Sequence, residues 1–229
     1  MTSIAVIFGA SGGIGSAMRD HLEAGSGYDK VIALHRTSSP PLDLLDERMI
    51  QACADWIRER EGDVRLLFDA TGALTLGSAR PEKSLRELDP EVLARSYAIN
   101  AIGPALLMKH FLPLLPKEGR SVFATLSARV GSIGDNGLGG WFAYRAAKAG
   151  LNQLVRTASI ELARKNPAAI CVALHPGTVK TPLTENFAKT GLDVQEPAVA
   201  AERLVQVLTS LMPADTGGFF DQTGRPIPW

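Results

Sequence analysis

Gly9-Ala10-Ser11-Gly12-Gly13-Ile14-Gly15 follows directly after the apolar run Ile4–Phe8, and a helix-like segment begins within it. Glycine permits a tight turn, and its missing side chain lets backbone amides approach a pyrophosphate. The following helix places the positive end of its dipole at the same point. An ordinary glycine-rich loop is the alternative, but a glycine turn that ends a first strand and opens a helix favours a nucleotide site. The predicted nucleotide-binding residues are Gly9, Ser11, Gly12, Gly13, Ile14 and Gly15.

Short apolar runs alternate with longer helix-like segments along the rest of the chain. Runs that are apolar throughout are typical of a parallel sheet buried on both faces, and repeated strand–helix order indicates a doubly wound α/β sheet. We therefore predict a single Rossmann-type domain over residues 1–229, with helices on both faces of the sheet. The expected strands are Ile4–Phe8, Val31–His35, Val64–Asp69, Ser121–Ser127 and Ala169–His175, with a brief strand near Gly218–Phe220. The expected helices are Gly13–Glu23, Asp46–Glu61, Pro90–Leu112, Trp141–Lys165 and Pro197–Leu211.

The composition excludes several classes of protein. A chain of 229 residues that is 45% hydrophobic suffices for one domain with a substantial core. Lys and Arg number 24, as do Asp and Glu, so no overall positive field attracts nucleic acid or an anionic membrane. The N-terminus lacks the features of a secretory signal, and the most apolar stretch, Ala98–Leu115, is interrupted by polar residues. Cys53 and Cys171 are expected to be reduced core residues, and the histidines lack metal-ligand spacing. These observations predict a cytoplasmic protein without a metal, a nucleic-acid partner or a membrane partner.

The second predicted strand ends at His35-Arg36-Thr37-Ser38. Sites for NAD place an acidic residue about 20 positions after the glycines to bind the ribose hydroxyls, whereas an Arg accommodates a 2′-phosphate. The chain offers Arg36 here, with hydroxyls beside it and no carboxylate. We therefore predict NADP(H) in preference to NAD(H); a solvated surface arginine is the alternative.

Tyr144 and Lys148 are four residues apart in a predicted helix, so their side chains share one helix face. A fixed positive charge beside a phenol favours phenolate. We expect Lys148 to lower the pKa of Tyr144 toward the range of a general acid/base. By itself this spacing is common, and a partly buried Tyr beside a solvated Lys is the simpler interpretation.

With Gly9-x-x-x-Gly13-x-Gly15 followed by Tyr144-x-x-x-Lys148, the chain resembles the classical short-chain dehydrogenases/reductases over nearly its whole length. The resemblance implies that Asp43 lies near the adenine and that Asn100 positions a water connecting Lys148 to solvent. It also implies that Lys148 holds the nicotinamide ribose. The segment Gly131–Trp141 is most similar to the C-factor and sniffer-type carbonyl reductase branch. The cofactor-binding residues that the resemblance adds are Asp43, Gly72, Asn100, Tyr144, Lys148, Pro176, Gly177, Val179 and Thr181.

Two motifs depart from the family pattern. The usual Asn-Asn-Ala-Gly after the fourth family strand reads Asp69-Ala70-Thr71-Gly72 and keeps only the glycine. The usual Ser-Ser-x-x-Gly after the fifth strand reads Ser127-Ala128-Arg129-Val130-Gly131, so Ala128 stands where the family has its substrate-binding serine. Ser127 is the adjacent candidate, and Ser132 lies five residues further along. Because side chains alternate across a strand, Ser127 faces the site only if the chain twists or bulges there.

The resemblance implies hydride transfer between NADP(H) and a ketone or aldehyde, or a secondary alcohol, with Tyr144 as general acid/base. The expected substrate loops are Gly131–Trp141 and Leu183–Leu192, with Trp141 and Phe142 as apolar contacts. The expected catalytic residues are Tyr144, Lys148, Asn100 and Ser127.

Two other functions stay open. The C-factor resemblance and the missing serine also fit an NADP(H)-binding signalling or regulatory protein with weak or no turnover. An epimerase or dehydratase is less favoured, because the chain is too short for the larger substrate domain of those enzymes. The resemblance also implies a homodimer or homotetramer, because members of the family commonly pair the two long helices, here Pro90–Leu112 and Trp141–Lys165.

Overall fold

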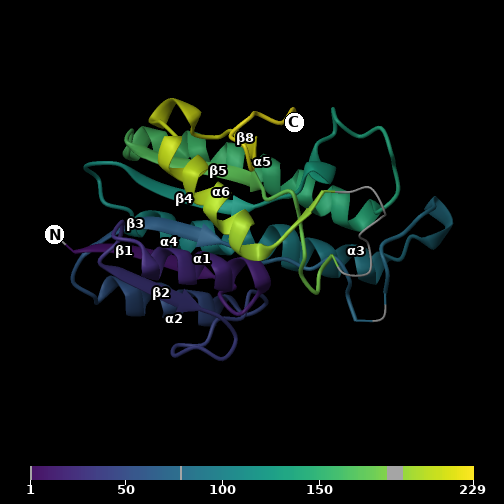
Figure 1. Cartoon of the computed structure of the whole chain (residues 1–229). Coiled ribbons are helices and arrows are strands. Elements are labelled where there is room, and N and C mark those ends of the chain that lie inside the picture. Colours follow the sequence, from purple (N-terminus) through teal and green to yellow (C-terminus); the bar gives the residue numbers. More distant parts are fainter. Residues whose placement is uncertain (1, 78, 185–192) are drawn as a thin grey trace.

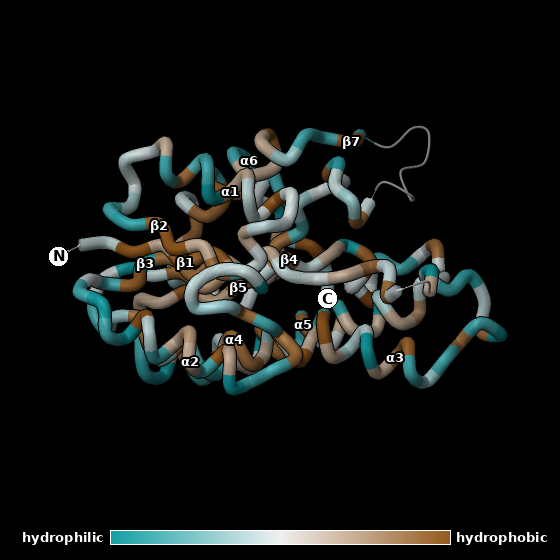
Figure 2. The backbone as a smooth tube through the Cα atoms, turned by 90° about the horizontal axis from the view of Figure 1, so that it is seen from below, coloured by the Kyte–Doolittle hydropathy of each residue, from teal (hydrophilic) through white to brown (hydrophobic). Residues whose placement is uncertain are grey.

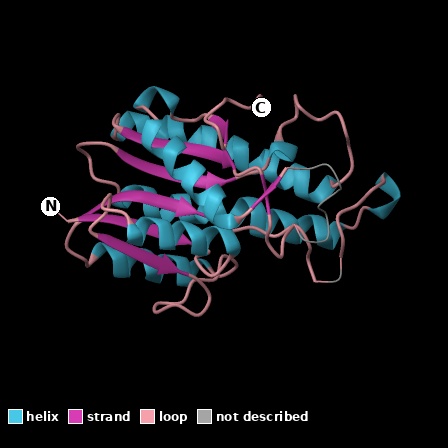
Figure 3. Cartoon of the chain, viewed as in Figure 1, coloured by secondary structure: helices cyan, strands magenta, loops and turns pink. Residues whose placement is uncertain are grey.

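The computed structural model describes residues 2–77, 79–184 and 193–229 and contains a six-stranded parallel sheet with the order β2-β1-β3-β4-β5-β8 (Figures 1 and 3). The chain starts one strand in from an edge of the sheet, adds that edge strand next, and then crosses back to add the remaining strands on the other side of the first. This order confirms the doubly wound α/β fold. The strands are β1 (Ser3–Phe8), β2 (Lys30–Leu34), β3 (Asp63–Asp69), β4 (Ser121–Leu126), β5 (Ala169–His175) and β8 (Phe219–Asp221). Two further short strands, β6 (Thr178–Val179) and β7 (Val194–Gln195), pair with each other.

Helices cover both faces of the sheet (Figure 2). Helices α1 (Gly13–Ala24) and α6 (Pro197–Ser210) pack on one face, and α2 (Glu47–Arg58), α4 (Gly103–Phe111) and α5 (Phe142–Lys165) pack on the other. Successive strand residues point to opposite faces, so Phe123 joins the core under α5 while Ala124 joins the core under α1 and α6. Burial on both sides explains why these strands read as continuous apolar runs.

The predicted continuous helix Pro90–Leu112 is wrong in one respect. The structure divides it into α3 (Pro90–Tyr97), a π-helical segment Ala98–Ile102 and α4. Pro104 supplies the physical reason, because it has no N–H to donate to the carbonyl of Asn100, its partner in a regular α-helix. The helix therefore widens around Asn100, and π-helical segments of this kind are frequent at functional sites.

Other predicted boundaries are confirmed to within a few residues. The fourth sheet strand ends at Leu126, one residue before Ser127. Short 3₁₀ turns occur at Leu85–Glu87, Leu112–Leu114, Arg129–Gly131 and Pro213–Asp215. Cys53 and Cys171 are free thiols buried in the core, as expected. No helix within the described residues is long and apolar enough to cross a membrane.

Candidate active site

The glycine turn forms a cradle at the carboxyl end of β1. Gly9 adopts a φ of +75°, which favours glycine, and its carbonyl accepts the N–H of Gly12 at 3.0 Å. Gly12 is the N-cap of α1, where no side chain caps the free amides and no acidic residue occupies the first turn. A Cβ at Gly15 would lie 2.3 Å from the Gly9 oxygen, so the loop rests directly on the helix. Uncapped amides at a helix N-terminus fit a pyrophosphate.

Two other segments lie against this cradle. A Cβ at Gly9 would meet the Thr71 methyl at 3.0 Å, which places the end of β3 beside the loop. A Cβ at Gly13 would meet the Thr181 methyl at 2.7 Å. The segment Pro176–Thr181 is held in place because the Pro176 carbonyl accepts the side-chain amide of Gln195. The structure thus brings Thr181, the last residue of the predicted segment Pro176–Thr181, to the start of α1.

Arg36 follows β2 at the same edge of the sheet. The end of β2 contacts the cradle, since Gly9 N–H donates to the Leu34 carbonyl at 2.9 Å. Arg36 is exposed, and no ion pair of it is found within residues 2–77, 79–184 and 193–229. The Asp43 carboxylate accepts the N–H of Leu45 at 2.9 Å and so closes its own turn. These positions leave the guanidinium of Arg36 available to an anionic group.

Tyr144 and Lys148 lie one turn apart on α5, with the Lys148 Nζ 5.8 Å from the centre of the Tyr144 ring. Lys148 is buried, and its ammonium donates to the Leu126 carbonyl at 2.8 Å. Burial lowers the pKa of Lys148 to about 8, and the nearby charge of Asp69 acts against that shift.

The expectation that Lys148 lowers the Tyr144 pKa is wrong for this structure. Burial of the phenol raises its pKa above the usual range. The ammonium is directed at the Leu126 carbonyl, so it does not offset the desolvation of Tyr144. Trp141 adds to the apolar surroundings, because its ring lies edge-to-face with Tyr144 at 6.4 Å between ring centres.

Asn100 links the π-helical segment to the loop after β3. Its side-chain oxygen accepts the N–H of Ala73 at 3.0 Å, and its amide donates to the Ala73 carbonyl at 2.8 Å. A Cβ at Gly72 would lie 3.1 Å from the Asn100 Oδ1 and 3.5 Å from the Lys148 Nζ. Gly72, Asn100 and Lys148 therefore meet at one point, although they are far apart in the sequence.

The predicted catalytic role of Ser127 required a twist or bulge that turns its side chain toward the site, and Ser127 does not meet that condition. The strand pairing of β4 with β5 is regular up to Leu126, and Ala128 keeps an extended backbone. Ser127 therefore stays on the α5 side of the sheet, where its buried hydroxyl donates to the Asn152 side chain at 2.6 Å. Alternation directs Ala128 to the other side. Ser132 also has a hydrogen-bond partner, because its hydroxyl donates to the Pro228 carbonyl.

Sequence reasoning missed two polar residues next to the site. Asp69 is fully buried at the end of β3, and its only sequence signal was the departure from the usual asparagine. Asn152 lies one helical turn after Lys148 and binds Ser127. The four-residue spacing between Lys148 and Asn152 is a signal that could have identified it.

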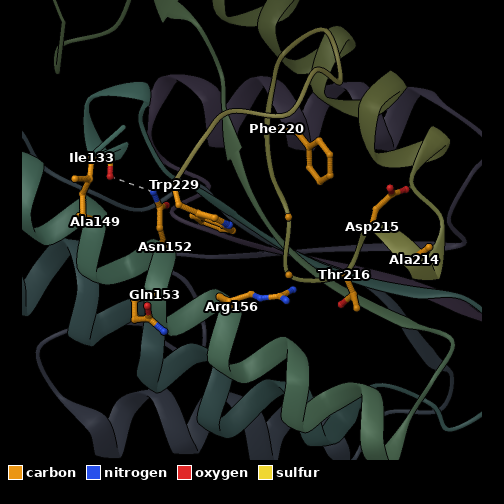
Figure 4. A pocket seen from close by; sticks show the side chains of 13 residues that line it. Ile133, Ala149, Asn152, Gln153, Arg156, Ala214, Asp215, Thr216, Phe220 and Trp229 are labelled. Carbon is orange, nitrogen blue, oxygen red and sulfur yellow. Dashed lines mark hydrogen bonds between the residues drawn. The ribbon is translucent and has the colours of Figure 1, made fainter. Parts of the chain in front are cut away.

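A cavity of about 690 Å³ lies beside α5, next to the turn before β8 (Figure 4). Asn152 and Gly131 belong to its wall, together with Arg156 and Trp229. Neither Tyr144 nor Lys148 lines it. Of the two predicted substrate loops, Gly131–Trp141 is described and carries exposed apolar side chains such as Leu138. Most of the other, 185–192, lies outside the described residues.

Comparisons with known proteins agree with this geometry. The sequence profile of the short chain dehydrogenase family matches residues 3–191. C-signal of Myxococcus xanthus is 34% identical over 169 residues, which cover 73% of this chain and 94% of that protein. The structure of NADPH-bound carbonyl reductase from chicken fatty liver superposes with a TM-score of 0.86 at 27% identity, covering 100% of this chain and 99% of that one. Carbonyl reductase Sniffer of D. melanogaster shares the fold, with a TM-score of 0.85 at 22% identity and 100% of both chains covered. The chain therefore belongs to the short chain dehydrogenase family of oxidoreductases, and its relatives include C-signal and carbonyl reductases.

Proposed function

We propose that the protein is an NADP(H)-dependent carbonyl reductase in which Tyr144 is the general acid/base. The observation that carries the proposal is the meeting of Gly72, Asn100 and Lys148 beside Tyr144, on the same sheet edge as the glycine cradle. The residues at this point come from three chain segments, and apolar packing does not explain why they converge. The natural substrate class is a ketone or aldehyde, with a secondary alcohol in the reverse direction.

The cofactor would lie across the carboxyl ends of the strands. The amides of Gly12, Gly13 and Ile14 would hold the pyrophosphate, and Arg36 would bind the 2′-phosphate. Asp43 and Gly72 would line the adenine and nicotinamide portions, and Pro176–Thr181 would contact the carboxamide. When bound, NADP(H) supplies or accepts the hydride. The NADPH seen in the chicken carbonyl reductase structure supports this choice of cofactor.

Tyr144 would donate its phenolic proton to the carbonyl oxygen during reduction. Its raised pKa keeps the phenol protonated at neutral pH, which is the state that reduction requires. Lys148 would hold positive charge beside the developing oxyanion, because a pKa of about 8 leaves it mostly protonated at neutral pH. Pro104 has no N–H to donate to the carbonyl of Asn100. That carbonyl would therefore accept a hydrogen bond from a water that returns protons from solvent.

Tyr144→Phe tests this role. General acid/base groups contribute about 10²–10⁴-fold to rate, so we expect turnover of reactive aldehydes and ketones to fall by about 10²-fold or more. NADPH affinity, followed by cofactor fluorescence, should stay near that of the wild type. Tyr97→Phe is the matched control, since Tyr97 is a partly exposed tyrosine on α3 and should keep full turnover. Near-normal turnover in Tyr144→Phe would remove Tyr144 from the mechanism.

A second candidate function is NADP(H)-dependent signalling or regulation with weak or no turnover. Ala128 in place of the family serine and the binding of Ser127 to Asn152 favour it, as does the similarity to C-signal. Tight NADPH binding without NADPH oxidation across a broad carbonyl panel would support this function over the enzyme.

We also propose that the chain is one cytoplasmic domain and forms a homodimer or homotetramer through the outer surface of α3, α4 and α5. Several apolar side chains are exposed there, namely Tyr97, Ile102, Leu154 and Ile160. Burial of such side chains between two copies would be favourable. Light scattering after gel filtration measures the oligomeric state, and charged substitutions at Ile102 and Ile160 should then yield monomers.

A further inference from the structure

Asp69 is a fully buried carboxyl group that the proposed mechanism does not use. It is the last residue of β3, at the position where the family motif Asn-Asn-Ala-Gly begins with asparagine. One carboxylate oxygen accepts the Thr71 N–H at 2.9 Å and the Thr71 hydroxyl at 2.5 Å. The other accepts the Thr125 hydroxyl from β4 at 2.6 Å. Asp69 therefore has three hydrogen-bond partners, and each can donate to it.

This arrangement suits an ionised carboxylate. Complete burial disfavours the charge and raises the pKa of Asp69, while the three donors and the positive charge of Lys148 act in the opposite direction. The Thr71 N–H can only donate, which fixes one carboxylate oxygen as an acceptor. A buried carboxylate without donors would be expensive, so the two threonines are matched to its charge.

Lys148 is the cation that responds to this charge. Its ammonium bonds the carbonyl of Leu126, the residue that follows Thr125 on β4. The other groups packed around it are neutral polar or apolar: Asn100 and Gly72 on one side and Gly131 behind its own stem. Tyr144 is the remaining titratable neighbour, and it is on the same helix. Among the described residues, Asp69 is the one acidic group whose charge acts on Lys148.

Building on the proposed function, we propose that Asp69 is a positioning residue whose buried carboxylate keeps Lys148 protonated and thereby sets the alkaline limit of carbonyl reduction. The charge acts through space and through the Thr125–Leu126 backbone, since Asp69 does not bond Lys148 directly. An asparagine at this position would leave Lys148 to lose its proton at a lower pH.

Asp69→Asn is the sharpest test, because it removes the charge and keeps the shape. The amide oxygen can still accept the Thr71 N–H, and the amide NH₂ can donate to the Thr125 hydroxyl. A neighbouring opposite charge shifts a pKa by about 1–3 units, so the alkaline limb of kcat for NADPH-dependent reduction should move down by about 1 unit or more. Asp63→Asn is the matched control on the opposite end of β3, where Asp63 pairs with Arg65, and it should leave the limb in place.

A stability measurement tests the same interaction without activity. In urea unfolding at neutral pH, Asp69→Asn, Lys148→Met and the double variant form a cycle. If the charges interact, Lys148→Met should be less destabilising in the Asp69→Asn background, with a difference of about tenfold in the unfolding equilibrium constant (about 1.4 kcal/mol). This result would stand even if Tyr144→Phe refuted the reductase.

An additive cycle together with an unmoved alkaline limb would overturn the proposal while leaving the reductase intact. Should Asp69→Asn not fold, Thr125→Val removes one donor and makes the carboxylate less ionised. It should move the alkaline limb in the same direction by a smaller amount. An unchanged limb in Thr125→Val would then count against Asp69.

Discussion

Gly15→Ala is the substitution whose effect the structure defines most closely. A Cβ at Gly15 would lie 2.3 Å from the Gly9 oxygen, 2.9 Å from the Gly9 carbonyl carbon and 3.1 Å from the Ala10 Cα. All three atoms are backbone, so no side chain can rotate away. Carbon atoms make favourable contacts at about 3.5–4.0 Å, and the cradle must therefore move by roughly 1 Å relative to α1.

Two effects on stability oppose each other. Alanine is favoured over glycine in a helix by about 1 kcal/mol, whereas an extra methyl in a packed site costs about 1–3 kcal/mol. Because the contact is with backbone atoms, the cost at Gly15 should be at the upper end of that range. We therefore expect the free energy of unfolding to fall by about 1–2 kcal/mol. For a chain of this size the melting temperature should fall by about 2–8 °C.

Cofactor binding should respond more strongly than stability. The displaced amides are those proposed to hold the pyrophosphate, and a hydrogen bond to a charged group contributes about 1.5–3 kcal/mol. Loss of one such bond weakens NADPH binding by about tenfold or more. Fluorescence titration measures the affinity, and calorimetry measures the melting temperature on the same samples.

Gly150→Ala is the helix-matched control. Its Cβ would meet the edge of the Tyr97 ring at 3.2 Å and the Ala101 methyl at 3.9 Å, and both are side-chain atoms. NADPH affinity should stay unchanged in this variant. Wild-type affinity and an unchanged melting temperature in Gly15→Ala would refute the reasoning, because the close approach of loop and helix would then have no energetic consequence.

Four further outcomes are expected. Arg36→Ala should weaken NADPH binding by about tenfold or more while leaving NADH binding unchanged; equal losses for both cofactors would remove Arg36 from the 2′-phosphate site. Ala128→Ser should raise turnover, because it restores a hydroxyl at the position where the family motif has its substrate-binding serine, and a rate no higher than wild type would show that the hydroxyl is not used. Ser127→Ala should keep turnover and lose about 1 kcal/mol of stability with the bond to Asn152; a large loss of kcat at unchanged stability would restore Ser127 to catalysis. Burial lowers the pKa of His175 to about 4 from 6.5, so the unfolded chain binds the extra proton between these values and stability should fall as pH drops through that range, by at most about 3 kcal/mol. His175→Asn should flatten this part of the stability–pH curve relative to wild type.

Local signals predicted most of the secondary structure. The strands were visible because each is buried on both faces and so consists almost entirely of apolar residues. The prediction of one continuous helix over Pro90–Leu112 was wrong, since the apolar residues continue across Pro104. A proline with no N–H, four residues after Asn100, was the signal for the π-helical segment, and it needed only the rule for helix hydrogen bonds.

The residues of the candidate site were predicted less completely than the secondary structure. Tyr144, Lys148 and the glycine cradle were recognisable because each motif is a short segment with a fixed spacing. The orientation of Ser127 and the direction of the Tyr144 pKa shift were not, because they depend on Asn152 and on burial. Asp69 was visible as a departure from a motif, and two of its donors belong to nearby Thr71. Its third donor, Thr125, comes from β4, and its relation to Lys148 depends on the packing of α5.

By itself the sequence determined the doubly wound sheet, the glycine turn and the spacing of Tyr144 and Lys148. These features follow from backbone freedom at glycine and from the periodicity of apolar residues, which are properties of short segments. Only the tertiary structure decided where the Lys148 ammonium points, which side of the sheet Ser127 faces and how Asp69 is held. Thr125 and Asp69 are separated by 56 residues. Charges and hydrogen bonds between such distant residues depend on burial, and burial exists only once the sheet and α5 have packed together.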